Sequence, residues 1–290
     1  MINWPDSLVK DIALRRCVFV LGAGISMNSV NEAGQRPKSW LQFLNDSTNG
    51  LPNATYKQSI RKLIKTGDYL TACEVLKTAL GRDAFVDLLM NEFHTPGFKV
   101  SEIHKLIFQL DVRIVITPNF DNIYDRYANQ ESNGTILVKK HFDKDIAESL
   151  RLNKRVILKN HGSIETPNEI IFTRKDYAEA RTKFQNFYTI LDSLSITNTF
   201  LFLGCGTSDP DIRILLENNK FRFQYSRQHY FTLSKKSNPK GVNEVLENTM
   251  NLKILEYDKK DNHKEFKDSI AELFKRVESS RDEIAKSQNW

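Results

Sequence analysis

Short apolar runs alternate with segments of helical periodicity along most of the chain. The runs predict strands, one beginning at Cys17 and the others at Val112–Ile116, Thr135–Val138, Val156–Leu158, Ile170–Phe172, Thr199–Leu203, Tyr230–Leu233 and Lys253–Tyr257. Apolar residues three or four apart predict the helices between them, at Asn122–Tyr127, Lys144–Leu150, Lys175–Ser193, Asp211–Asn218, Lys240–Glu247 and about Lys264–Lys286. This alternation favours an α/β fold with a doubly wound, parallel, Rossmann-like sheet.

Residues 40–111 follow a different pattern. They contain no convincing strand, and helical spacing recurs in three segments, at 60–64, 70–80 and 85–93, after a helix expected at Trp40–Asn45. We therefore expect residues 1–290 to form a single catalytic domain, with residues 40–111 as a small all-helical insertion subdomain.

The first predicted strand runs directly into a glycine turn. Residues 17–26 read Cys-Val-Phe-Val-Leu-Gly-Ala-Gly-Ile-Ser. Glycine allows backbone to approach a pyrophosphate closely, and the N-terminus of a helix favours an anion, so the pattern indicates nucleotide binding. The third glycine of the dinucleotide fingerprint would fall at Met27 and is absent, and without Gly-Lys-Ser or Gly-Lys-Thr a P-loop is excluded. An ordinary strand-to-turn connection is the alternative.

Three further polar segments begin where predicted strands end. They are Ile-Thr-Pro-Asn-Phe-Asp at 116–121, Leu-Lys-Asn-His-Gly-Ser at 158–163 and Phe-Leu-Gly-Cys-Gly-Thr-Ser-Asp at 202–209. Ligands of open α/β sheets bind beyond the carboxyl ends of the strands. We therefore expect these segments and the glycine turn to line one pocket.

The order of these motifs resembles the sirtuin superfamily. It is more closely similar to bacterial sirtuin-like antiphage proteins that hydrolyse NAD, over roughly residues 15–260, and the Pro-x-x-Trp at 37–40 also looks like those relatives. The resemblance implies an NAD glycohydrolase with NAD as its substrate, nicotinamide and ADP-ribose as its products, and defence by NAD depletion. It implies contacts to NAD from Gly22, Ala23, Gly24, Ser26, Asp121, Gly204, Ser208 and Asp209. Cys205 and Gly206 depart from the Thr-Ser that follows this glycine in deacylating sirtuins.

Asn119 and His161 are the catalytic candidates. Cleavage of the nicotinamide–ribose bond passes through a cation-like ribose and needs a positioned water or hydroxyl. The Asn119 amide can donate and accept at once and so orient that group. His161 can take its proton, because an unperturbed imidazole titrates near neutral pH. The alternatives are an Asx turn or helix cap for Asn119 and a structural, hydrogen-bonded histidine for His161.

The binding candidates each have a structural alternative. Asp121 binds the nicotinamide end, orients Asn119, or is a first-turn helix acid. Asp209 precedes Pro210, which is typical of an N-cap, with an adenosine-ribose contact as the other interpretation. Ser26 donates to a phosphate, caps a helix, or does both. Tyr177 is expected to pack near the pocket.

The three cysteines, at 17, 73 and 205, lie far apart in the sequence. They cannot form the four-cysteine zinc module of sirtuin deacylases, and we expect no metal. Scattered cysteines also indicate a reducing compartment. The chain has no apolar run of 18 residues and no signal-peptide pattern, so we expect a cytoplasmic protein without a membrane span.

Composition adds little to this picture. The 290 residues are 40% hydrophobic and 27% charged, which suits a globular chain, and the net charge is +6. The basic stretches, such as Lys139–His141 and Lys235–Lys236, are short and scattered. They favour solvated faces over a nucleic-acid track.

The sequence therefore predicts a metal-free NAD hydrolase that must be restrained in the healthy cell. We expect control by homo-oligomerisation or by a partner, and the resemblance suggests a hexameric HerA-type ATPase or a short Argonaute. A zinc-free NAD-dependent protein deacylase and a non-catalytic nucleotide-sensing module are the alternative functions.

Overall fold

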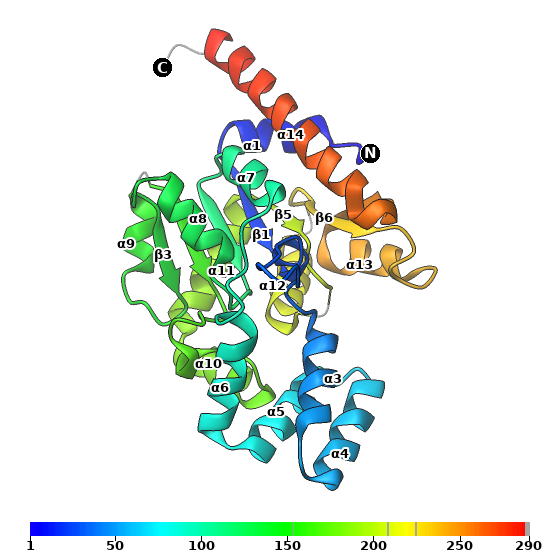
Figure 1. Ribbon diagram of the computed structural model, residues 1–290. Helices are drawn as coiled ribbons and strands as arrows, with labels where there is room; N and C mark the ends of the chain where they lie inside the picture. The colour runs from blue at the N-terminus through cyan, green and yellow to red at the C-terminus, as the bar shows by residue number, and fades with distance from the viewer. Residues whose placement is uncertain (153, 208, 224, 288–290) are drawn as a thin grey trace.

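The computed structural model describes residues 1–152, 154–207, 209–223 and 225–287 (Figure 1). The strands are β1 Cys17–Leu21, β2 Ile114–Thr117, β3 Leu137–Lys140, β4 Val156–Lys159, β5 Thr199–Leu203, β6 His229–Ser234 and β7 Leu252–Tyr257. The first helices are α1 Asp6–Ala13, α2 Ala23–Ser26, α3 Trp40–Gly50, α4 Ala54–Lys65, α5 Tyr69–Leu80, α6 Arg82–Phe93 and α7 Glu102–Gln109. The later ones are α8 Ile123–Glu131, α9 Ile146–Arg151, η1 Pro167–Glu169, α10 Arg174–Lys183, α11 Gln185–Thr197, α12 Pro210–Arg222, α13 Val242–Met250 and α14 Lys260–Ser287.

The strands form one seven-stranded parallel sheet in the order β3-β4-β2-β1-β5-β6-β7. The predicted doubly wound α/β fold is confirmed. β1 lies at the centre and pairs with β5 so that Leu21 lies opposite Leu203. The two strands therefore end level with each other, and the turns that follow them are neighbours.

Both faces of the sheet are covered by helices, and β1 shows how the sequence encodes this. Its residues alternate between two apolar clusters: Cys17, Phe19 and Leu21 join α1, α7, α8 and α14 on one face, while Val18 and Val20 join α9 and α11–α13 on the other. A parallel strand buried on both faces reads as a continuous apolar run. This is why the segment before the glycine turn carries no polar residue.

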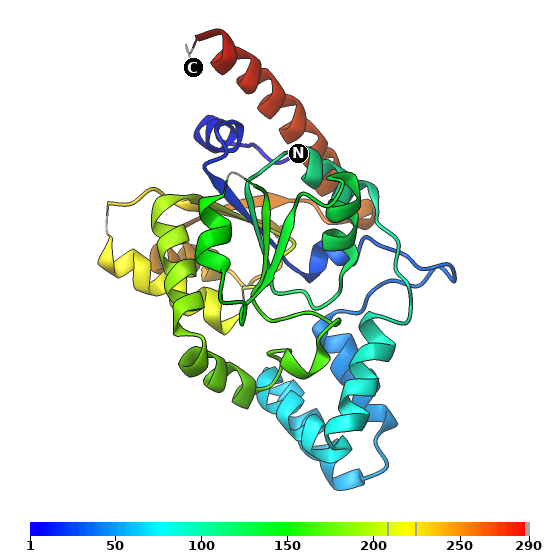
Figure 2. The same ribbon diagram turned by 90° about the vertical axis from the view of Figure 1, so that its left-hand side faces the viewer.

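The helices α3–α6, which we call the helical wall, lie beyond the carboxyl edge of the sheet (Figure 2). They share an apolar cluster that includes Phe43 and Leu76, and the loops after β2 and β4 add Phe120 and Phe172 to it. Helix α7 also falls within residues 40–111, but it packs against α14 at the opposite end of the sheet.

Two predicted elements differ from the structure. Residues Ile170–Phe172 are not a strand: they form an extended connection after η1, in which Ile170 and Phe172 pack into the apolar cluster of the helical wall. The single helix predicted at Lys175–Ser193 is two helices, because the chain leaves helical geometry at Phe184, where φ is −115° and ψ is 40°.

A close backbone contact joins the turns after β1 and β5. The Gly22 N–H donates to the Leu203 carbonyl at 2.9 Å, and the Gly24 N–H donates to the Gly204 carbonyl at 2.9 Å. Gly204 has a φ of +62°, and a Cβ atom there would lie 2.7 Å from the Ile25 nitrogen. No side chain fits between the turns, and glycine alone adopts this φ without strain.

We predict that Gly204→Ala destabilises the protein by about 3 kcal/mol, since it adds both a strained φ and a backbone clash. Gly34→Ala is the matched control, because Gly34 has a φ of +75° but no atom within 4 Å of the point where a Cβ would lie. That variant should lose only the cost of the left-handed conformation, about 1 kcal/mol. Urea unfolding measures both, and equal losses would contradict the clash.

A second prediction concerns acid stability. His229 is buried in the sheet, its Nδ1 accepts the Phe200 N–H at 3.1 Å, and burial lowers its pKa to about 4. This pKa lies below that of a histidine in the unfolded chain, about 6.5. Between pH 6.5 and 4 the unfolded chain therefore binds more protons than the folded protein. As the pH falls through this range, the free energy of unfolding drops by about 3 kcal/mol because of His229.

His229→Asn supplies a side-chain acceptor that does not titrate, so its stability should fall less steeply over the same pH range. Part of the slope should persist, because burial also lowers the pKa values of His104 and His141 to about 4. Denaturant unfolding at a series of pH values gives both slopes. An unchanged slope in the variant would refute the assignment.

Candidate functional site

A cavity of about 450 Å³ lies between the carboxyl edge of the sheet and the helical wall. Its volume is within the range of about 300–1,000 Å³ that is typical of small-molecule sites. Seven of the residues expected to act in the site line it: Gly22, Ala23, Ser26, Asn119, Asp121, His161 and Asp209. Gly24 and Gly204 are not among its lining residues and instead contact each other. Ser208 lies outside the described residues.

The opposite side of the cavity is apolar and comes largely from the helical wall. Trp40 and Phe43 of α3 and Phe93 of α6 line it, together with Phe172. The Trp40 and Phe172 rings stack with centroids 4.8 Å apart and an interplanar angle of 12°. This surface was not expected from the sequence, although the Pro-x-x-Trp motif had indicated its first residue.

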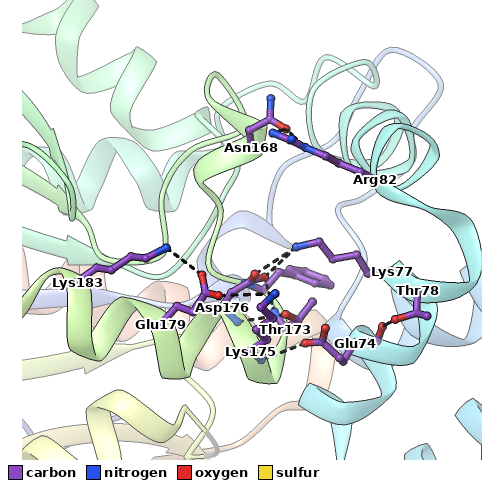
Figure 3. Close-up of polar contacts among 11 residues, drawn as sticks. Glu74, Lys77, Thr78, Arg82, Asn168, Thr173, Lys175, Asp176, Glu179 and Lys183 are labelled. Atoms are coloured by element: carbon purple, nitrogen blue, oxygen red, sulfur yellow. Dashed lines mark hydrogen bonds and ion pairs between the residues drawn. The ribbon is translucent and has the colours of Figure 1, made fainter.

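Polar contacts fasten the helical wall to the segment after β4 (Figure 3). The Lys77 ammonium lies 3.2 Å from an Asp176 oxygen, the Lys175 N–H donates to Glu74 Oε2 at 3.0 Å, and Arg82 Nη2 donates to Asn168 Oδ1 at 3.1 Å. These contacts connect α5 and α6 with α10 and η1, so both sides of the cavity are held at a defined separation.

A chain of hydrogen bonds links the glycine turn to the loop after β2. Asn119 Nδ2 donates to Ser26 Oγ at 3.1 Å, and Ser26 Oγ donates to Asp121 Oδ2 at 2.8 Å. The other carboxylate oxygen of Asp121 accepts the N–H of Ile123, the first residue of α8, at 3.1 Å. Asp121 therefore orients Asn119 through Ser26 and also binds a free backbone N–H at the start of α8. The amide N–H₂ of Asn119 thus faces Ser26, and its carbonyl oxygen is directed away from that partner.

Lys159, at the end of β4, stabilises the loop after β2 by hydrogen bonds. Its side chain is fully buried, and its ammonium donates to the Asp121 carbonyl at 2.5 Å and to Asp125 Oδ2 at 3.1 Å. Burial raises the pKa of Asp125, while the Lys159 charge opposes that shift. The sequence feature that corresponds to this buried cation is a lysine at the end of an apolar strand, immediately before Asn-His-Gly.

His161 follows β4 and is only 2% exposed. Its Nδ1 lies 3.3 Å from the Tyr177 hydroxyl, and its Nε2 lies 3.4 Å from Asp209 Oδ2 and 3.9 Å from Asp211 Oδ2. Gly162 makes the turn possible, with a φ of +85° and no room for a Cβ atom, which would lie 2.8 Å from the Glu169 carbonyl.

Tyr177 does more than the expected packing. Besides its contact with Nδ1, its ring meets the imidazole edge to face, with centroids 4.9 Å apart. Burial, followed by the Asp209 charge, raises the pKa of this phenol well above its usual value, so it stays protonated. A hydroxyl that carries a proton therefore lies beside the imidazole at the cavity, 3.5 Å from Asp209 Oδ2 as well.

The turn after β5 completes the site. Asp209 is the N-cap of α12, as predicted: its Oδ1 accepts the N–H groups of Asp211 and Ile212, both at 3.0 Å. Cys205 lines the cavity, and its thiol donates to the Val20 carbonyl at 3.3 Å. Burial raises the pKa of this thiol, which therefore remains neutral.

The arrangement suits chemistry on a bound polar molecule. An amide, an imidazole and a phenol converge on one cavity whose far side is aromatic.

Across the described ranges, no three His, Cys, Asp or Glu side chains are grouped so as to hold a metal ion. No helix in the part of the chain that the structure describes is long and apolar enough to cross a bilayer.

Comparison with known proteins agrees with the predicted resemblance. Residues 113–255 match the SIR2-like domain family. The chain is 28% identical over 151 residues to NAD(+) hydrolase ThsA of Acinetobacter baumannii (strain 532279), covering 52% of this chain and 31% of that protein. It is 23% identical over 227 residues to NAD(+) hydrolase ThsA of Bacillus cereus (strain MSX-D12), covering 78% and 44%.

Defense-associated sirtuin 2 of Bacillus subtilis is also similar, at 23% identity over 206 residues, which cover 69% of this chain and 19% of that protein. The chain thus spans less than half the length of these relatives. The resemblance to sirtuin-like defence proteins is confirmed. The glycine turn and the helical wall lie outside the segment matched by the SIR2-like domain.

We predict that Lys159→Met destabilises the protein by about 3 kcal/mol, because it leaves the Asp125 carboxylate buried without its partner. Replacing both residues, as Lys159→Met with Asp125→Leu, should lower the loss to about 1 kcal/mol, since no uncompensated charge remains. Urea unfolding of the two variants checks this. A single variant as stable as the wild type would show that the ion pair does not hold the loop.

Proposed function

We propose that this sirtuin-like chain hydrolyses NAD at the bond between nicotinamide and ribose. The observation that carries the proposal is that Asn119 and His161, which follow two different strands, line one cavity together with the glycine turn. The names of the relatives, NAD(+) hydrolase, support the same activity.

The proposed site divides the dinucleotide between two regions. The pyrophosphate lies against Gly22, Ala23 and Ser26, where the absence of side chains allows close approach. Gly24 and Gly204 act indirectly, by bringing the two turns together. The nicotinamide end lies toward Asn119 and the aromatic side of the cavity, where apolar rings exclude bulk water and so disfavour competing reactions.

The reaction needs little acid catalysis, because nicotinamide leaves as a neutral molecule with the electron pair of the broken bond. The ribose becomes cation-like, and water adds at the same carbon. The Asn119 carbonyl oxygen accepts a hydrogen bond from that water and orients it, while the water proton passes to the His161 side of the cavity. The products are nicotinamide and ADP-ribose.

The biological setting is part of the proposal. Depletion of NAD in antiphage defence follows from the resemblance, and such an activity must be restrained until infection. Self-association or a partner, with a HerA-type ATPase or a short Argonaute as candidates, would supply the restraint in the cytoplasm.

We predict that Asn119→Ala and His161→Ala each lower the rate of nicotinamide release from NAD at least about 100-fold, because Asn119 orients the water and His161 takes part in removing its proton. Asn218→Ala and His94→Ala are matched controls at exposed positions outside the cavity and should retain the wild-type rate. Nicotinamide is measured over time by chromatography, with and without candidate partners, and circular dichroism confirms folding.

The same assay tests the alternative functions. A hydrolase releases nicotinamide without any acylated peptide, whereas a deacylase requires one. Release that depends on an acetyl-lysine peptide, full activity in Asn119→Ala, or binding of NAD without release under every partner condition would each refute the proposed hydrolase.

A further inference from the structure

The environment of His161 raises the question of which atom meets the substrate. The imidazole is 2% exposed, and each ring nitrogen faces another side chain: Nδ1 faces the Tyr177 hydroxyl at 3.3 Å, and Nε2 faces Asp209 Oδ2 at 3.4 Å. Tyr177 itself lines the cavity. His161 lines the same cavity, and the Tyr177 side chain is 3% exposed. Both groups therefore border the space that a substrate would occupy, but the two imidazole nitrogens are already engaged by neighbouring side chains.

The carboxylates decide which nitrogen carries the proton. Oδ2 of Asp209 lies 3.4 Å from Nε2 and Oδ2 of Asp211 lies 3.9 Å from it. Neither contact has hydrogen-bond geometry, but the two nearby anions favour a proton on Nε2 electrostatically. Nδ1 is then an acceptor for the Tyr177 hydroxyl at 3.3 Å, and Asp209 Oδ2, at 3.5 Å, is a second acceptor within reach of the same hydroxyl. In the opposite tautomer, Nε2 would bring a lone pair toward two carboxylates.

Both carboxylates are fixed by further contacts, although the Tyr188 hydroxyl binds the same Asp211 oxygen that faces Nε2. Asp209 is held by the α12 N–H groups that its Oδ1 caps. Asp211 accepts from Arg181 Nε at 2.8 Å and from the Tyr188 hydroxyl at 2.9 Å. Their orientation toward the imidazole is thus set by the helix start and by two neighbouring helices, α10 and α11.

We propose that Tyr177, His161 and Asp209 form a proton relay in which the Tyr177 hydroxyl receives the proton from the attacking water and passes its own proton to His161. The proposal rests on the proposed hydrolysis of NAD. Tyr177 is thereby a further catalytic residue that touches the water, and Asp209 is a positioning residue that acts through His161.

The transfers balance. The water oxygen forms its bond to the ribose carbon, and the carbon–nitrogen bond breaks with its electron pair on nicotinamide. The water proton moves to the Tyr177 oxygen while the phenol proton moves to His161 Nδ1. The resulting imidazolium lies between Tyr177 and the carboxylates of Asp209 and Asp211, and it later releases a proton to solvent.

Besides Asp211, Arg181 and Tyr188, a further titratable group lies close to the relay. His141, from the segment after β3, is buried, and burial together with the His161 charge lowers its pKa to about 4. It is neutral at the pH of a reducing cell interior, and so it adds no positive charge that would oppose the imidazolium.

The kinetic test compares Tyr177→Phe with Tyr127→Phe, a remote tyrosine whose ring packs on Phe108. Tyr177→Phe should lower kcat about 100-fold with KM changed by less than about threefold, and Tyr127→Phe should match the wild type. In a double-mutant cycle, His161→Ala with Tyr177→Phe should be no slower than His161→Ala alone, because members of one relay act as a unit. Near-normal kcat in Tyr177→Phe, or two effects that multiply, would overturn the relay.

A second test does not depend on activity. Nitrogen-15 NMR of the histidine rings, with His161 assigned by comparison with His161→Ala, should show the neutral ring protonated on Nε2, and Tyr177→Phe should shift the Nδ1 signal toward that of a free acceptor. A proton on Nδ1 in the wild type would overturn the proposal. If the wild type never releases nicotinamide, the proposed function fails, and the NMR result still decides the relay geometry.

Discussion

The site depends on the approach of two backbone turns. β1 and β5 end level with each other, and the turns after them touch through Gly22, Gly24 and Gly204 at distances that exclude any side chain. This contact sets the position of Ser26, where the hydrogen-bond chain starts, and of Asp209, the N-cap of α12. The position of the two turns that border the cavity thus depends on the absence of side chains at these three glycines. The polar side chains of the site lie around the turns.

From this contact the polar side chains extend in two directions. On one side, Ser26 joins Asn119 and Asp121, and the loop that carries them rests on the buried ammonium of Lys159. On the other, Asp209 joins the start of α12 to His161. Each group is held by a neighbour that has a second, structural contact. Such fixed orientation is what catalysis by positioning requires.

The sheet could be predicted because a parallel strand buried on both faces leaves a short, uninterrupted apolar run, as in β1. The same pattern misled at Ile170–Phe172, because an apolar run has the same appearance whether it pairs in a sheet or packs into a cluster. The break between α10 and α11 carries no proline or glycine, so helical spacing continued through it.

The motifs brought Asn119 and His161 to one edge of the sheet, since the ends of parallel strands meet there. The side-chain contacts that orient Asn119 and His161 could not be predicted from the sequence. The distance between Tyr177 and His161 depends on how η1 and the following connection fold back over the sheet, and the role of Lys159 depends on a partner 34 positions away. Tertiary packing decides both, and local propensity does not encode it.

The helical wall has an apolar cluster that is largely separate from the two that cover the sheet. Mutational effects at well-separated, independently packed positions are close to additive. The exception is where Phe120, next to Asn119, and Phe172 pack within the wall cluster. Replacements of wall residues remote from these two rings therefore change the apolar side of the cavity with little effect on the loops that carry the polar groups, whereas replacements that touch them alter entry and chemistry together.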